Sequence, residues 1–425
     1  MEILVKELRD VLELLAPAVP RKTTLPVLQN VLLEGTRARA SDLEVMVSVD
    51  LGREVGDPFC IPHHQLYDLL KFTPGDTMLV LTPASQPGGM LSVKMKSGTA
   101  SLVTGKAADY PPAPTIQDPK VAVLDGTALI KALGQILPYT ASEESRPVLT
   151  AACVTLGDPV EVAAADGFRL AIQQIPERHL HLNGHKLLIP GHTIKVLAHL
   201  WEHASTAPEL QEEDGPAQMA IGKRLLRLEY TDKLVRITFG KVTLITQLAQ
   251  GTFPNYGPLI PTDLPQRASF MAGDMRQALD LVREVARGGS GIVRLSWEGE
   301  DMTVMATATE MGEVTAQVRL LVPCTAAGKI AIDVKYLVEY FKGQEGIVSM
   351  GVSSPSAPAL FTTAGMPDVV MMPMFVQWDG AQPTTEEQNP AEEQPSQEPS
   401  GEPVAEDSVT AAPVAKKGRK PRKKA

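Results

Sequence analysis

Apolar and polar residues follow one another along this chain in a phrase that is repeated. The stretches "FCIPHHQLYDLLKF" (59–72) and "LLIPGHTIKVLAHL" (187–200) both join a short apolar run to Ile-Pro, two polar residues and an apolar stripe. A third version, "KIAIDVKYLVEYF" (329–341), has Asp333 in place of the proline. After each junction the apolar residues recur every three or four positions, which is the spacing of a helix with one buried face. Each phrase therefore predicts a strand that leads into a helix.

The residues at the three junctions predict where these helices begin. Proline is tolerated at the first helical position, because its missing N–H has no partner there, so Pro62 and Pro190 are expected at that position. Aspartate is a preferred N-cap, so Asp333 is expected to cap the third helix.

Other elements repeat in phase with this phrase. "LPVLQNVLLEG" (25–35) is echoed by "RPVLTAACVTLG" (146–157), and amphipathic helices are expected near the N-terminus, at 125–140 and at 271–288. The unit is a helix, several strands, a second helix and further strands, and it occurs three times. A period of about 120–145 residues is longer than that of a solenoid repeat. The pattern predicts an α+β fold of three repeated domains.

Proline-rich connections at 109–120 and 252–267 mark the predicted boundaries. The predicted domains are residues 1–120, 121–264 and 265–376. The remaining residues, 377–425, are rich in Pro, Glu, Gln and Ser and end in "KKGRKPRKKA". Such a composition buries too little apolar surface to fold, so an acidic and then basic disordered tail is expected.

Composition narrows the class of protein. The chain has 425 residues, 44% of them hydrophobic but only 4% aromatic, so its cores must be built from aliphatic side chains and Met. Cys60, Cys153 and Cys324 form no CxxC pair, which argues against a disulfide framework or a thiolate zinc site. No signal peptide and no membrane-spanning run is evident. These features predict a cytoplasmic protein without a membrane partner. The net charge of −10 argues against nucleic acid, although the charge is unevenly distributed.

One stretch raises the possibility of catalysis. "HLWEH" (199–203) matches the H-x-x-E-H pattern of one class of zinc proteases, so a zinc-dependent hydrolase is an alternative. The same histidines continue a polar stripe with His192 and Lys195, which favours a solvated or anion-facing helix side. No glycine-rich phosphate loop or nucleophile elbow is present, so no catalytic residue, metal or cofactor is assigned.

Three further segments have two interpretations each. "AADGFRLAI" (164–172) is typical of a hairpin turn, and also suits a binding loop. The charged face of 271–288 is either solvated or directed at phosphates. "DVVMMPMFV" (368–376) is either a final core strand or an adaptable apolar surface, since Pro373 is poorly suited to a central strand.

Taken together, "TLPVLQNVLLEG", "SRPVLT", "ADGFRLA", "FPNYGPLIP" and "VMMPMFV" resemble the bacterial DNA polymerase III beta subunit, the sliding clamp family, in order and spacing over about residues 1–376. The resemblance implies three DNA-clamp (processivity-fold) domains and a six-domain ring formed by a head-to-tail homodimer. It implies a non-catalytic, nucleoid-associated processivity factor that encircles double-stranded DNA. Its implied partners are the replicative DNA polymerase, the clamp loader complex and other proteins with clamp-binding motifs, among them repair polymerases, ligase and mismatch-repair proteins.

The resemblance also implies two sets of binding residues. The pocket for partner peptides that carry Gln, Leu and an aromatic residue would use Leu149, Gly167, Phe168, Arg169, Leu170, Pro254, Tyr256, Leu259, Val370, Met371, Met372, Pro373 and Met374. The DNA-facing cations would be Arg21, Lys22, Lys71, Lys195, Arg276 and Arg283.

The chain departs from the family pattern at two pocket positions. Phe168 stands where the family commonly has His, and Phe375 where it often has Arg. A more apolar pocket with a different motif preference is expected. A clamp paralogue specialised for repair or for resistance to an inhibitor therefore stays open beside the replicative clamp. The basic end of the tail is either solvated or in contact with DNA beside the ring.

Overall fold

The computed structural model describes residues 1–83, 89–143, 146–175, 184–204 and 224–378. The chain divides into two compact units, Met1–Val376 and Gln377–Ala425. Every helix and strand discussed below belongs to the first unit. Most of the predicted tail lies outside the described residues, so its order and its contacts stay predictions.

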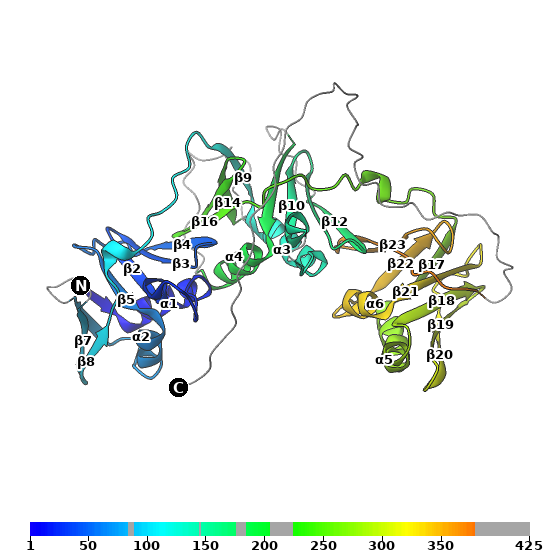
Figure 1. The fold of residues 1–425 in the computed structure, drawn as a ribbon, viewed down its shortest axis with the longest axis horizontal. Coiled ribbons are helices and arrows are strands. Elements are labelled where there is room, and N and C mark those ends of the chain that lie inside the picture. Colours follow the sequence, from blue (N-terminus) through cyan, green and yellow to red (C-terminus); the bar gives the residue numbers. More distant parts are fainter. Residues whose placement is uncertain (84–88, 144–145, 176–183, 205–223, 379–425) are drawn as a thin grey trace, which may run out of the picture. The chain divides into compact units, whose positions relative to one another are not determined.

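The first unit is built from one α+β pattern that occurs three times (Figure 1). The first repeat contains β1 (Glu2–Leu4), α1 (Val5–Leu15), β2 (Asn30–Glu34), β3 (Arg37–Ser41), β4 (Val45–Asp50), β5 (Phe59–Pro62), α2 (His63–Leu70), β6 (Met78–Thr82), β7 (Met90–Met95) and β8 (Gly98–Val103). The second contains β9 (Lys120–Asp125), α3 (Gly126–Ile136), β10 (Ala151–Leu156), β11 (Val160–Ala165), β12 (Arg169–Ile175), β13 (His185–Pro190), α4 (Gly191–His203), β14 (Leu225–Tyr230), β15 (Leu234–Phe239) and β16 (Val242–Gln247). The third contains β17 (Gln266–Met271), α5 (Ala272–Gly288), β18 (Ile292–Glu298), β19 (Asp301–Ala308), β20 (Gly312–Arg319), β21 (Gly328–Asp333), α6 (Val334–Phe341), β22 (Ile347–Val352), β23 (Ala359–Thr363) and β24 (Asp368–Met371). The predicted α+β fold of repeated domains is confirmed.

The repeated phrase corresponds to three strand-to-helix junctions, namely β5–α2, β13–α4 and β21–α6. Asp333 caps α6, as predicted: its Oδ1 accepts a hydrogen bond from the Lys335 N–H at 2.8 Å. The prediction that Pro62 and Pro190 stand at the first helical position is wrong. Both have extended backbone, end their strands and precede the helix by one residue. The proline nitrogen donates nothing to the ladder, so proline suits a strand end that is about to leave the sheet.

Strand pairing joins the repeats to one another. Each repeat forms two antiparallel four-stranded halves, and the adjoining halves merge into eight-stranded sheets. One sheet has the order β5-β2-β3-β4-β16-β15-β14-β9, and the other β13-β10-β11-β12-β24-β23-β22-β17. The seams are therefore β4–β16, with Ser48 opposite Thr243, and β12–β24, with Leu170 opposite Val370. The halves β1-β6-β7-β8 and β20-β19-β18-β21 remain four-stranded among the described residues.

The main core lies between the helices and one face of each sheet. Alternate strand residues point to this face, since side chains in a strand alternate between its two sides. In α5 the residues Met275, Leu279, Val282 and Ala286 are all buried, as the helical spacing predicts. The large aromatic side chains of the third repeat that this core encloses are Phe270, Trp297, Tyr340, Phe341 and Phe361. The opposite sheet faces are left for binding surfaces.

A pair of glycines in α3 provides a test of the packing. A Cβ at Gly126 would lie 2.1 Å from the Trp201 ring, whereas a Cβ at Gly134 would meet nothing within 4 Å. Gly126→Ala should lower the free energy of unfolding by about 1–3 kcal/mol, the usual cost of overpacking. Gly134→Ala should be neutral or raise it by up to about 1 kcal/mol, because alanine is the better helix former. Urea unfolding followed by tryptophan fluorescence measures both, and equal effects would contradict this packing.

Candidate functional site

The segment 164–172 forms the hairpin turn between β11 and β12. Asp166 Oδ1 accepts hydrogen bonds from the N–H groups of Phe168 and Arg169, at 2.9 and 2.8 Å. Gly167 has φ +95°, a backbone conformation that glycine adopts without the steric cost of a Cβ. The turn therefore holds Phe168 at its tip and sends Arg169 back into the sheet.

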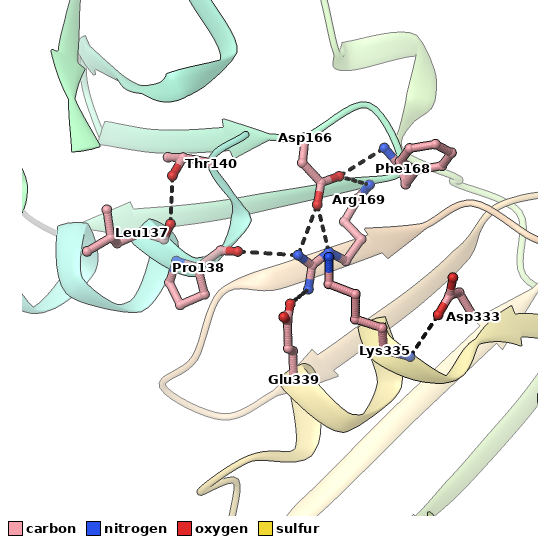
Figure 2. A network of polar contacts seen from close by, with 9 residues as sticks. All are labelled: Leu137, Pro138, Thr140, Asp166, Phe168, Arg169, Asp333, Lys335 and Glu339. Carbon is pink, nitrogen blue, oxygen red and sulfur yellow. Dashed lines mark hydrogen bonds and ion pairs between the residues drawn. The ribbon is translucent and has the colours of Figure 1, made fainter. Parts of the chain in front are cut away.

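Arg169 is the centre of a polar network between the second and third repeats (Figure 2). Its side chain is only 4% exposed. Nε and Nη2 donate to Asp166 Oδ2 at 3.0 and 2.9 Å, and Nη2 also donates to the Pro138 carbonyl at 3.3 Å. Nη1 forms an ion pair with Glu339 Oε2 of α6 at 2.8 Å. The guanidinium thus ties the β11–β12 turn to a helix of the next repeat.

Aromatic rings complete the surroundings of this guanidinium. The Arg169 Cζ atom lies 5.1 Å from the Tyr139 ring centroid and 4.5 Å from the Tyr336 ring centroid. At these distances a cation is attracted to the face of an aromatic ring. Phe168 stacks on Tyr336 with a centroid separation of 5.8 Å, yet it remains 53% exposed. Arg169 therefore acts inside the junction, while Phe168 faces solvent.

An apolar cluster covers the sheet face opposite the main core at the same junction. Its buried members are Leu149, Ala151, Cys153, Ala163, Leu170, Ile172, Leu188, Phe253 and Val370, with Tyr256, Ile260 and Leu360 packed against them. Four of the residues expected in the peptide pocket, Leu149, Leu170, Tyr256 and Val370, are thus brought together. They come from four separate segments of the chain. The cluster straddles the β12–β24 seam, since Leu170 pairs with Val370.

The other expected pocket residues lie around this cluster in different ways. Pro254, Leu259 and Met372 are exposed, and the Met372 N–H donates to the Phe168 carbonyl at 2.9 Å. Met371 is fully buried in the main core, on the other side of the sheet. Pro373 follows the end of β24, as its poor fit to a central strand predicts. The Met374 N–H donates to the Ala331 carbonyl at 2.8 Å, so this segment turns toward β21.

Sequence reasoning missed several members of the cluster. Phe253 directly precedes the quoted "PNYGPL", and Cys153, Ile172 and Leu188 follow from strand alternation once the seam is known. Burial raises the pKa of the Cys153 thiol, which is therefore a packing group with little thiolate character. Burial, followed by a hydrogen bond that the Tyr256 hydroxyl donates to Glu161, raises the pKa of Tyr256. The Tyr256 hydroxyl is therefore a polar group held in place beside the apolar cluster.

The cluster gathers apolar side chains next to solvent. It combines a buried apolar floor with the exposed side chains of Leu259 and Met372, which lie next to its members Ile260 and Val370 in the chain. Large exposed apolar groups gathered in one place mark binding surfaces in soluble proteins. Within the described residues, no group of three His, Cys, Asp or Glu side chains could hold a metal ion.

The "HLWEH" histidines make other contacts in α4. His199 Nε2 lies 2.9 Å from the Glu13 carbonyl oxygen, and His203 Nδ1 lies 2.9 Å from the carbonyl oxygen of His199. The two rings stack at 4.1 Å. Among the described residues these histidines belong to no group of three His, Cys, Asp or Glu side chains that could hold a metal ion, so the zinc-hydrolase alternative has no support.

The cations expected to face DNA are dispersed over the helices and their ends. Arg21 and Lys71 line one cavity of about 440 Å³ next to α2, and Lys22 and Lys195 are exposed. Arg276 donates to the Gln344 carbonyl. Arg283 pairs with Asp280 at 2.9 Å and with Glu284 at 3.5 Å, which offsets much of its charge. Contact of these residues with DNA stays a prediction. No helix of the described residues is long and apolar enough to span a membrane.

Comparison with known proteins gives consistent matches. The family described as "DNA polymerase III beta subunit, central domain" matches residues 123–255. The curated beta sliding clamps of Synechocystis and Synechococcus elongatus are each 25% identical to this chain, over 84% and 87% of it and 94% and 97% of their own lengths. The solved DNA polymerase III beta subunit of Thermotoga maritima aligns with a TM-score of 0.76 at 20% identity, and the DNA polymerase sliding clamp of Pseudomonas aeruginosa with 0.75 at 23%. Each structural alignment covers 88% of this chain and 99% of the other.

The Arg169 network predicts unequal effects of its members on stability. Arg169→Met leaves the mostly buried Asp166 carboxylate without its partner and should lower the free energy of unfolding by about 3 kcal/mol or more. Glu339 is 41% exposed, so Glu339→Gln should cost about 1 kcal/mol or less. Arg53→Met, which breaks the exposed Arg53–Glu7 pair, is the matched control and should also cost about 1 kcal/mol or less. Urea unfolding measures the free energy of unfolding of all three variants. If Arg169→Met lowers it no more than the control does, the Arg169 network makes no special contribution to stability.

Proposed function

Because this chain is a member of the DNA polymerase III beta subunit family, the beta sliding clamps, we propose that it encircles duplex DNA and tethers the replicative polymerase to it. The activity is topological: a closed ring moves along DNA with its partner and needs no catalytic group. The chain would act as a processivity factor, and a clamp loader would open and close it with ATP.

The observation that carries this proposal is the way the repeats join. At both seams the edge strand of one half-sheet pairs with the edge strand of another. These pairs are β4 with β16 and β12 with β24. By position in the repeat, β20 is the equivalent of β4 and β12, and β8 is the equivalent of β16 and β24. Both are edge strands among the described residues. We propose that β20 of one copy pairs with β8 of a second copy, in a head-to-tail dimer.

Two such contacts would close a ring of six domains, because head-to-tail contacts form a ring when the rotation between copies brings the last copy back to the first. Unpaired edges invite another chain to add to the sheet. Apolar side chains stand at both edges, with Val103 at the end of β8 73% exposed and Met311 just before β20 54% exposed. A partner strand would cover them.

The DNA side of the ring needs only weak contacts. Phosphate-directed contacts from Lys and Arg are independent of base sequence and allow a protein to slide. Exposed cations for this purpose include Lys195 on α4 and Lys22 in the segment after α1, while acidic neighbours moderate others such as Arg283. Tight binding would hinder sliding, so a partly neutralised lining suits a tether.

Partner proteins would bind at the apolar cluster over the β12–β24 seam. A short peptide would place its Leu and aromatic side chains against Leu170 and Val370, with Phe168 at the margin. Buried apolar anchors of this kind contribute most of the binding energy of small interfaces. The replicative polymerase, the clamp loader and repair proteins with similar motifs would share this one surface.

Retention on DNA tests the function directly. Loaded by the loader of the same organism with ATP, the protein should stay on a nicked circular plasmid through gel filtration. It should be released when a restriction enzyme linearises the plasmid, because a topological link is lost at a free end. A parallel reaction without ATP is the control. Equal release from circular and linear DNA would refute the tether.

A further inference from the structure

The apolar cluster over the β12–β24 seam is bordered by two carboxylates on one side. In the strand registers Ala163 lies opposite Ile172, and Ile172 lies opposite Asp368 at the start of β24. Alternate residues of a strand lie on the same face of the sheet. Glu161 therefore shares a face with the cluster residue Ala163. For the same reason Asp368 shares a face with the cluster residue Val370, so both carboxylates border the cluster.

Glu161 is held in place by neutral groups. Its Oε1 accepts a hydrogen bond from the Tyr256 hydroxyl at 2.5 Å, and its Oε2 accepts one from Gln174 Nε2 at 3.2 Å. These donors orient the carboxylate and leave its negative charge in place. Glu161 makes no ion pair with a residue that the structure describes. In the same row Lys186 is two strands away, beyond Thr155.

Asp368 is a second carboxylate without a cation. It is exposed, and it forms no ion pair within the described part of the chain. Neighbouring side chains nevertheless remove part of its hydration, and this desolvation raises the pKa of Asp368. A pKa raised in this way means that the charged form lacks stabilisation, which a cation at its side would provide.

The other end of the surface, at the β11–β12 turn, is positive. Arg146 is exposed, and its Nη1 lies 3.4 Å from the position that a Cβ on Gly167 would take. The carboxylates next to this turn, Asp166 and Glu339, are already paired with Arg169. The apolar surface therefore runs from a positive end at the turn to a negative end at the two carboxylates.

This polarity limits which peptides fit the surface. Complementary charges fix the register of a bound chain and disfavour partners with the wrong sign. Two strand residues span about 7 Å, so a lysine or arginine two or three positions from an anchor on Val370 would reach Asp368. We propose that Glu161 and Asp368 select partner peptides that carry a lysine or arginine beside their apolar anchors. The inference rests on the proposed peptide surface and adds a charge requirement to it.

The test uses three fluorescent peptides and measures their anisotropy with the full chain. The neutral peptide is Gln-Ala-Gln-Leu-Ala-Leu-Phe-Ala-Gln, and the other two carry Lys in place of its first or its last Gln. One lysine peptide should bind about fivefold more tightly than the neutral peptide, the upper range for a solvent-accessible ion pair. The gain should shrink in about 1 M NaCl, where charges are screened within about 3 Å.

Variants of the carboxylates locate the source of this gain. Glu161→Gln with Asp368→Asn should bind the lysine peptide no more tightly than the neutral peptide. Asp368→Asn alone, at an exposed side chain, should at least halve the gain and keeps the test valid if the double variant does not fold. Glu298→Gln, at an exposed carboxylate on β18, is the matched control and should keep the whole gain.

The outcomes separate this inference from the function on which it rests. Equal binding of all three peptides, or a gain that the double variant keeps, would overturn the charge requirement while the peptide surface stands. Binding of none of the three would refute the peptide surface and the charge requirement with it.

Discussion

The backbone ladder across each seam is the interaction on which the rest of the structure depends. The pairs β4–β16 and β12–β24 merge half-sheets of neighbouring repeats, so each junction is as continuous as the interior of a sheet. Backbone hydrogen bonds are indifferent to side chains, which leaves the outer sheet face free to change its chemistry from one seam to the next. The apolar cluster at the second seam and the pocket at the first, which is lined by Arg37, Arg39, Arg227 and Arg236, are two results of that freedom. Among the described residues the same geometry leaves β20, the counterpart of β4 and β12, and β8, the counterpart of β16 and β24, as sheet edges.

At the second seam the junction between repeats and the proposed peptide surface share residues. The β11–β12 turn directs Arg169 inward, to Glu339 of the next repeat, and Phe168 outward, against Tyr336. The Met372 N–H bonds to the Phe168 carbonyl, so the end of the third repeat is held to the same turn. A peptide seated on this surface would therefore contact both repeats. Such a site is formed only when the seam is formed.

Much of the fold follows from local pattern in the sequence. The strand-to-helix phrases predicted three helix starts, and the buried face of α5 follows its apolar spacing. The exact role of Pro62 and Pro190 did not follow, because proline satisfies both a first helical position and a strand end, and the ladder decides between them. The cluster was predicted only in part, since its members come from distant segments that meet through the seam. The arginine-lined pocket at the first seam was missed altogether, because Arg39 and Arg236 are almost two hundred residues apart and carry no motif, and only the strand registers bring them to one face.

The absolute mass of the full chain in solution, measured by light scattering over a wide range of concentrations, tests the central claim most directly. If β20 of one copy pairs with β8 of another, the mass should be twice that of a single chain and should hold on dilution, because two seams must open for a ring to separate. A mass equal to one chain at every concentration would contradict the closed ring, and so would a mass that keeps growing with concentration, which would indicate open-ended chains.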